Sequence, residues 1–258
     1  MAQQTTAAPG AVPEILSLDW SDVTDSLRAG WRDFLAAPTY GLFFSCVYVI
    51  GGWLVIWAVM AKGQIWWTLP AAAGFPILGP FVACGYYEIS RRLEQGIPLR
   101  SHDIFRVVFR QKDRQIPSMA AVIVVFFLFW NFLSHMIFAL FLGNATMTNV
   151  SSSLTVFLSP EGLSMLAVGT LVGAAFATLL FSVTVVSLPM LLDREVDFVT
   201  AMLTSLALVR ENPVVLLGWG ALIAVCLFGG MLPLFFGLFV VLPVFGHATW
   251  HLYRRAIA

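Results

Sequence analysis

Two histidines near the C-terminus have the spacing of a metal-binding pair on a helix. His247 and His251 are four residues apart, which places both on one helical face. Glu88 occupies the position equivalent to His251 when the first and last parts of the chain are aligned. Two histidines and a carboxylate are a permissible zinc or iron ligand set. Near a membrane surface, however, Glu88 and His251 need only a hydrogen bond to each other or an arginine neighbour. We therefore predict a structural role and no metal.

A second polar pair lies in the middle of the chain. His135 follows Asn131 by one helical turn within a strongly apolar run. Polar groups inside lipid are costly, so each is a candidate functional residue. His135 and His247 are expected at different heights in the membrane and could not face each other across one haem. The polar intramembrane candidates, none with an assigned role, are Glu88, Asn131, His135, His247 and His251.

The sequence shows no apparatus for catalysis. It has no Ser-His-Asp spacing, glycine-rich phosphate loop, HExxH motif or paired carboxylates within an apolar segment. Cys46, Cys84 and Cys226 all lie in apolar segments without CxxC spacing, which is typical of packing residues. The formal net charge is zero, so no overall field favours nucleic acid. We expect a protein that is not an enzyme, with no cofactor and no nucleic-acid partner.

Composition places the chain in a lipid bilayer. Hydrophobic residues make up 59% of the sequence and charged residues 11%, with a mean hydropathy of +0.87. Soluble domains carry about a quarter charged residues. About twenty apolar residues suffice to cross a membrane as a helix. We predict an all-α bundle with six transmembrane helices, over residues 41–60, 67–87, 120–142, 163–192, 214–232 and 234–250.

Two of these segments have unusual composition. The second contains Pro70, Pro76 and Pro80, which predict a kinked or partly broken helix. The fourth is longer than a membrane requires, so we expect it to tilt or to continue past the lipid. It also carries a row of small residues suited to close helix contact, namely Gly169, Gly173, Ala174, Ala177 and Ser182.

Shared spacings indicate an internal repeat. Asp22 precedes Pro38 by the same sixteen positions that separate Asp197 from Pro213. Tyr87 likewise aligns with Trp250. We predict a disordered tail over residues 1–18 and one membrane domain over residues 19–258. Its three units, about 19–92, 98–192 and 193–258, would each consist of an amphipathic helix and a transmembrane hairpin, the middle unit being the least clear.

The distribution of basic residues predicts the topology. With six spans, 13 of the 14 lysines and arginines lie on one side, and only Lys62 lies on the other. Positive residues favour the cytoplasmic side. Both termini are therefore expected in the cytoplasm, and the repeats are expected to be parallel, unlike the inverted repeats of many transporters.

The last third of the chain carries a recognisable set of motifs. They are LPMLLDREVD from Leu188, Ala201-Met202, Ser205, Asn212-Pro213, and LPVFGHATWHLYR from Leu242. With these motifs, the stretch from Leu188 to Arg255 resembles an uncharacterised family of predicted bacterial integral membrane proteins, and the resemblance is looser over residues 41–92. Members are assigned to a domain of unknown function, and some are labelled cytochrome c oxidase subunits. The resemblance implies a bacterial inner-membrane location and six spans, and it brings no catalytic residue.

These observations favour a non-catalytic accessory, assembly or scaffold partner of a larger membrane complex. The alternative is a small-solute or lipid transporter that uses the second and sixth spans. A transporter should have a polar cavity lined by Glu88, Asn131, His135 or His247, whereas a scaffold should be dry and tightly packed there. The expected partners are the lipid bilayer and another membrane protein.

Overall fold

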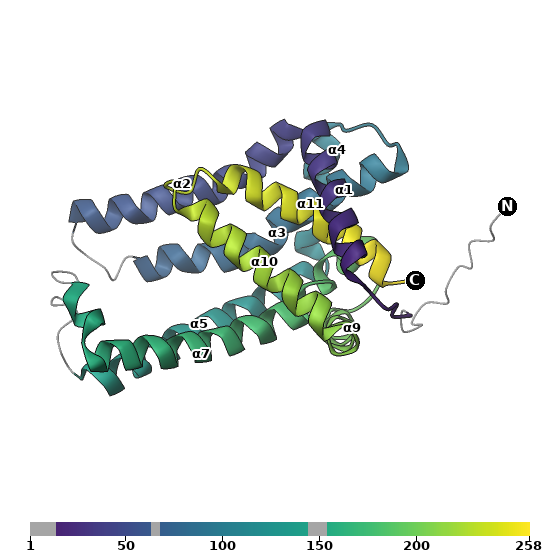
Figure 1. The fold of residues 1–258 in the computed structure, drawn as a ribbon. Helices are drawn as coiled ribbons and strands as arrows, with labels where there is room; N and C mark the ends of the chain where they lie inside the picture. Colours follow the sequence, from purple (N-terminus) through teal and green to yellow (C-terminus); the bar gives the residue numbers. More distant parts are fainter. Residues whose placement is uncertain (1–13, 63–67, 144–153) are drawn as a thin grey trace.

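The computed structural model describes residues 14–62, 68–143 and 154–258, and these are almost entirely helical (Figure 1). The predicted all-α class is confirmed. Short 3-10 turns cover Gln111–Asp113 and Leu154–Leu158. The α-helices are α1 (Trp20–Ala36), α2 (Pro38–Lys62), α3 (Thr68–Gln95), α4 (Ser101–Arg110), α5 (Ile116–Leu142), α7 (Pro160–Thr184), α8 (Ser187–Asp193), α9 (Phe198–Glu211), α10 (Pro213–Met231) and α11 (Leu238–Ala256).

Four segments of the described chain are long and apolar enough to cross a membrane. They are Pro38–Trp57, Ile116–Leu142, Pro160–Asp193 and Pro213–Met231, which correspond to the first, third, fourth and fifth predicted spans. The second and sixth predicted spans form α3 and α11, which run beside the others (Figure 1). Both of these helices extend past their apolar part into a polar, arginine-containing end.

Short surface helices precede the long ones, and aspartates cap two of them. The Asp19 carboxylate accepts hydrogen bonds from the backbone N–H groups of Ser21 and Asp22 at the start of α1. Asp197 accepts from the N–H groups of Val199 and Thr200 at the start of α9. Such caps satisfy N–H groups that lack a partner within the helix. The Ser21 and Thr200 hydroxyls also donate to these carboxylates, and these bonds lower the pKa of each aspartate.

Each of these two surface helices ends in the same way. Ala37, between α1 and α2, has φ −140° and ψ 51°, and Asn212, between α9 and α10, has φ −123° and ψ 50°. Each is followed by a proline, Pro38 or Pro213, which disfavours helical geometry in the residue before it and is itself suited to the first turn of a new helix. The surface helix therefore stops where the long apolar helix begins.

A break interrupts the fourth apolar segment but not α3. α3 is continuous from Thr68 to Gln95, so of the kink or partial break predicted from its three prolines, the break is not present. The fourth segment does break, at Val185–Val186, between α7 and α8. Pro189 accounts for this break, because its ring would clash with the carbonyl of Val185 four residues earlier. The freed N–H of Val186 donates to the Ser205 hydroxyl of α9 at 3.3 Å.

The disordered tail predicted over residues 1–18 includes five residues, 14–18, that the structure shows in ordered contacts. Ile15 forms an isolated antiparallel bridge with Ile257, and the Leu18 N–H donates to the Asn212 side chain at 2.7 Å. Residues 14–18 are therefore fixed against the C-terminus and the start of α10. Residues 1–13 lie outside the described part of the chain.

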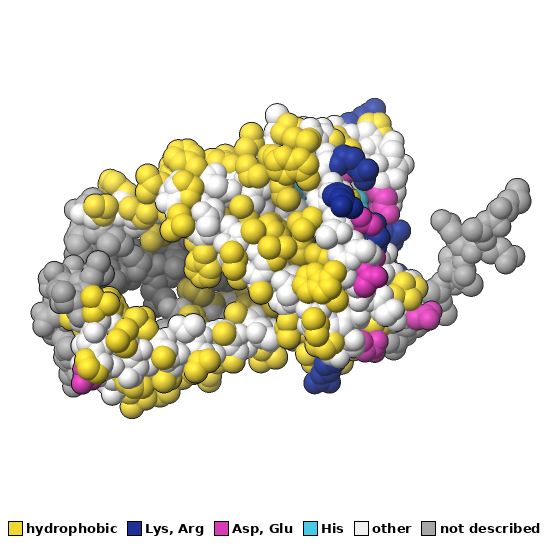
Figure 2. Space-filling view, viewed as in Figure 1, with side chains coloured by type: hydrophobic (Ala, Val, Ile, Leu, Met, Phe, Trp, Pro, Cys, Tyr) yellow, Lys and Arg dark blue, Asp and Glu magenta, His cyan; other side chains and the backbone are white. Residues whose placement is uncertain are grey.

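The buried core lies at the charged end of the molecule. Trp219, Trp250 and Tyr253 are almost fully buried there in one apolar cluster. α1 crosses α11 so closely that a Cβ on Gly30 would lie 2.6 Å from the Ala248 backbone nitrogen. Acidic and basic side chains gather at this end, and the rest of the visible surface is largely apolar (Figure 2). The apolar helices thus expose their side chains where lipid tails would lie.

Candidate functional site

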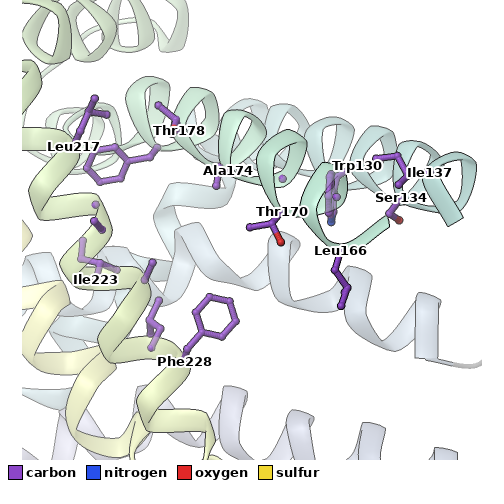
Figure 3. A pocket seen from close by; sticks show the side chains of 18 of the residues that line it. Trp130, Ser134, Ile137, Leu166, Thr170, Ala174, Thr178, Leu217, Ile223 and Phe228 are labelled. Atoms are coloured by element: carbon purple, nitrogen blue, oxygen red, sulfur yellow. The ribbon is translucent and has the colours of Figure 1, made fainter. Parts of the chain in front are cut away.

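An apolar groove lies between α5, α7 and α10 (Figure 3). Its volume is about 880 Å³. The visible surface is hollowed between α7 and α10 (Figure 2), and these two helices make few contacts with each other. Large apolar residues form much of the lining, among them Trp130, Met165, Phe181, Leu217, Ile223 and Phe228. The groove therefore suits an apolar occupant that approaches within the membrane.

Small residues face this groove from two helices. On α7, Gly169, Gly173 and Ala177 recur every fourth position, and on α10 Gly220 and Ala224 do the same. A Cβ on Gly169 would meet no atom within 4 Å, whereas one on Gly173 would lie 2.9 Å from the Trp130 ring and one on Gly220 would lie 3.2 Å from the Phe181 ring. Small residues four apart normally let two membrane helices approach closely. Here aromatic side chains pack on two of these glycines, and Gly169 faces open space.

Two hydroxyl groups also reach the groove. Thr170 and Thr178 of α7 line it, and Figure 3 shows the Thr170 side chain directed away from its helix into the space. Neither hydroxyl has a hydrogen-bond partner among the described residues. Ser134 of α5 lines the groove too, but it donates to the Asn131 carbonyl of its own helix. The two threonines can therefore donate to a helix that lies in the groove.

Glu88 is fully buried and held by arginines of its own helix. Its carboxylate accepts from Arg91 Nε at 2.8 Å and from Arg92 Nε at 2.6 Å. These are the i+3 and i+4 neighbours on α3, so the helix itself supplies both partners. Of the two structural roles considered for Glu88, the arginine neighbour is the one observed. The charge of this buried carboxylate is balanced by the two arginines.

His251 pairs with an aspartate that the sequence did not single out. Its Nε2 lies 2.7 Å from Asp33 Oδ2, which joins α11 to α1. The sequence pattern places Asp33 on the exposed, polar face of its helix, yet only 5% of the surface of the whole residue is exposed. Gly30 could have indicated this, because it lies three residues earlier on the same face, and glycine permits close packing.

His247 is fully buried beside α3. Its Nδ1 lies 2.8 Å from the Ser90 hydroxyl, and the Tyr86 ring meets it edge-on with 5.6 Å between ring centroids. Its Nε2 has no hydrogen-bond partner within the described ranges. His247 and His251 share a helix but bind different neighbours, so they do not act as a pair.

Asn131 and His135 are satisfied within α5. Asn131 Nδ2 donates to the Phe127 carbonyl at 2.9 Å, and His135 Nδ1 lies 2.7 Å from the Asn131 carbonyl. Neither side chain lines the groove, although their neighbours Trp130 and Ser134 do. Across residues 14–62, 68–143 and 154–258, no three His, Cys, Asp or Glu side chains form a group suited to a metal ion.

The central part of the chain matches a known protein family. Residues 68–193 match the model of the family described as predicted integral membrane protein (DUF2189). The match confirms the resemblance to an uncharacterised membrane-protein family. The DUF2189 region runs from α3 to α8, so it includes Glu88 and two of the three helices that form the groove. It shares Leu188–Asp193 with the stretch that carried the resemblance, and residues 68–92 with the part where the resemblance is looser. No curated protein and no solved structure matches the chain.

Proposed function

We propose that the protein is a non-catalytic accessory or scaffold subunit of a larger complex in the bacterial inner membrane, and that a transmembrane helix of the partner lies in the groove between α5, α7 and α10. The observation that carries this proposal is that small residues of α7 and α10 line the groove, with open space above Gly169. Helices in lipid gain little from hydrophobicity alone, so close packing and hydrogen bonds drive their association.

The dimensions of the groove are consistent with a helix. A helix about 10 Å across rises 1.5 Å per residue, so each residue fills roughly 120 Å³. A cavity of about 880 Å³ therefore holds about two turns. Thr170 and Thr178 would donate hydrogen bonds to the carbonyls of that helix.

The polar candidates support a scaffold over a small-solute transporter. Glu88, His247 and His251 are held in packed contacts at the charged end, and Asn131 and His135 bond to their own helix. None of these five lines the apolar groove between α5, α7 and α10.

We also propose six spans in three parallel units, with both termini in the cytoplasm. Three features support this: the one-sided distribution of basic residues, the matching geometry of Ala37 and Asn212, and the contact between Tyr87 and Trp250. The two rings stack with 6.5 Å between centroids, and the repeat alignment equates these two positions. Residues equated by a repeat meet each other where the two units share a pseudo-symmetry axis.

Cysteine labelling in intact cells tests the topology. A cysteine at the exposed position Ser101 should react with a membrane-impermeant maleimide only after the inner membrane is opened. A cysteine at exposed Glu161, just before the predicted fourth span, should react without opening. Labelling of the Ser101 position in sealed spheroplasts would contradict the proposed orientation.

Photocrosslinking in native membranes tests the occupant of the groove. A photoreactive amino acid at Thr170 should crosslink to a membrane-spanning peptide of one partner protein, in constant ratio to this chain. Gly169→Leu should abolish the crosslink, because a Cβ at this position meets no described atom within 4 Å and the added side chain would occupy space in the groove. Gly229→Leu is the matched control, because Gly229 also faces open space but does not line the groove. Equal loss in both variants, or no protein adduct, would refute the scaffold proposal.

The groove also favours a second candidate, a lipid transporter. Its lining is apolar and it is open on the membrane side, which suits a lipid better than a polar solute. It is lined by α5, α7 and α10 and not by α3 or α11, the helices that the sequence suggested for transport. Lipid adducts as the sole product at Thr170 would favour this candidate.

A further inference from the structure

A second cavity lies at the charged end, on the side of α3, α4 and α8. Its volume is about 530 Å³. Three arginines from separate segments line it: Arg91 of α3, Arg110 at the end of α4, and Arg114 just before α5. The apolar span of α5 begins at Ile116, two residues after Arg114. The cavity therefore lies at the level where lipid head groups meet the hydrocarbon.

One of the three arginines has no partner. Arg91 forms an ion pair with Glu88, and Arg114 forms one with Glu195. Arg110 is exposed and makes no ion pair or hydrogen bond within the part of the chain that the structure describes. A guanidinium has five N–H donors, so the two paired arginines also keep donors for a further ligand.

Hydrogen-bond acceptors line the same cavity. Gln111 is 2% exposed, and its Oε1 has no partner among the described residues. A buried acceptor without a partner indicates that a donor is missing. Asp113 and Asp193 are also in the lining, and Asp193 already accepts from the Tyr253 hydroxyl at 2.9 Å. The cavity thus offers both donors and acceptors to a ligand.

We propose that this cavity binds a phosphodiester head group that carries hydroxyl donors, as found in phosphatidylglycerol. Three arginines and two aspartates leave one positive charge in the lining, which matches the single negative charge of a phosphodiester. Arg110 and the free N–H groups of Arg91 and Arg114 bind the phosphate. The glycerol hydroxyls donate to the carboxylate of Asp113. Basic pockets at the cytoplasmic ends of membrane helices are suited to such head groups.

Binding of a short-chain lipid to the purified full-length protein tests this site. Dihexanoyl-phosphatidylglycerol should bind with one-to-one stoichiometry in isothermal titration. Arg110→Gln should weaken binding about tenfold, roughly the contribution of one hydrogen bond to a charged group. Arg110 has no structural partner, so this variant should fold. Arg106→Gln is the matched control on the same helix, since Arg106 does not line the cavity. The affinity of this variant for the lipid should stay within about twofold of the wild-type value.

Two further ligands identify which part of the lipid the site recognises. Dihexanoyl-phosphatidylethanolamine, which has no net charge, should bind more weakly than phosphatidylglycerol. Glycerophosphoglycerol, the same head group without fatty acids, distinguishes a lipid from a soluble ligand: equally tight binding would support the site and make its ligand a soluble phosphodiester. Equal loss in Arg106→Gln and Arg110→Gln, equal affinity for both lipids, or no binding would overturn the proposal.

Discussion

His251 on α11 and Asp33 on α1 are joined by a contact of 2.7 Å between Nε2 and Oδ2. Both side chains are largely buried, with exposed fractions of 16% and 8%. α1 makes its most extensive contacts with α11, so this pair lies within the interface that holds the first surface helix to the bundle.

Removal of the carboxylate should destabilise this interface. Asp33→Ala is expected to lower the free energy of unfolding by about 3 kcal/mol, because it leaves a buried polar partner unpaired. Thermal unfolding in detergent would show a clear fall in Tm. Asp25→Ala removes a half-exposed aspartate that pairs with Arg28 and, at 3.6 Å, with Arg255, and the solvent-screened pairs should cost less than about 1 kcal/mol. Equal shifts in the two variants would contradict the structural role of Asp33.

Gly30 should not tolerate even a methyl group. Alanine usually stabilises a helix relative to glycine by about 1 kcal/mol. At Gly30, however, the added Cβ would lie 2.6 Å from Ala248 N and 2.7 Å from the Val244 carbonyl oxygen, which are backbone atoms. We expect Gly30→Ala to lose about 2 kcal/mol through overpacking. Gly169→Ala, with no atom within 4 Å, should instead raise the Tm slightly. A stabilised Gly30→Ala variant would show that α1 and α11 are farther apart.

The turn between α10 and α11 contains strained backbone. Leu234 and Phe235 have positive φ angles of 51° and 68°, which cost a side-chain-bearing residue about 1–2 kcal/mol each. Leu234→Gly should relieve part of this strain and stabilise the protein by about 1 kcal/mol. Leu232 is similarly exposed but has φ −55°, so Leu232→Gly should destabilise. The two melting curves should shift in opposite directions.

Acid should weaken the α9 cap. Hydrogen bonds from Thr200 and Val199 lower the pKa of Asp197 below its ordinary value of 3.8. The folded state therefore binds this proton less readily than the unfolded state. The stabilisation is full above pH 3.8 and is lost as the pH falls through the lowered pKa. Asp197→Asn keeps an acceptor that does not titrate. The Tm difference between wild type and Asp197→Asn should be largest near neutral pH and shrink below pH 3.8; a constant difference would contradict this account.

The sequence predicts the local features of this fold well. Pro38 and Pro213 mark the boundaries between surface helices and spans because proline constrains the residue before it. The break at Val185–Val186 was within reach of the same reasoning, since Pro189 excludes a helical bond four residues earlier. The continuity of α3 could not be predicted in this way. A helix in lipid is retained despite prolines when every alternative leaves more backbone groups unpaired.

The candidate site depends on contacts that spacing does not encode. Asp33 and His251 are 218 positions apart, and nothing in either local pattern identifies the other. The row of small residues on α7 can be recognised in the sequence, but the groove beside it cannot. Whether such a row contacts a helix or faces a groove depends on how α10 is placed, which follows from packing at the opposite, charged end.

The unequal lengths of α7 and α10 have a consequence for the groove between them. α7 has 25 residues, or about 37 Å, whereas α10 has 19, or about 28 Å. A hydrocarbon layer of about 30 Å accommodates α10 upright but requires α7 to tilt. A thicker bilayer would bring α7 closer to upright and change the angle at which the two helices diverge. Fatty-acid length would then regulate how firmly the groove holds its occupant, with no modification of the protein itself.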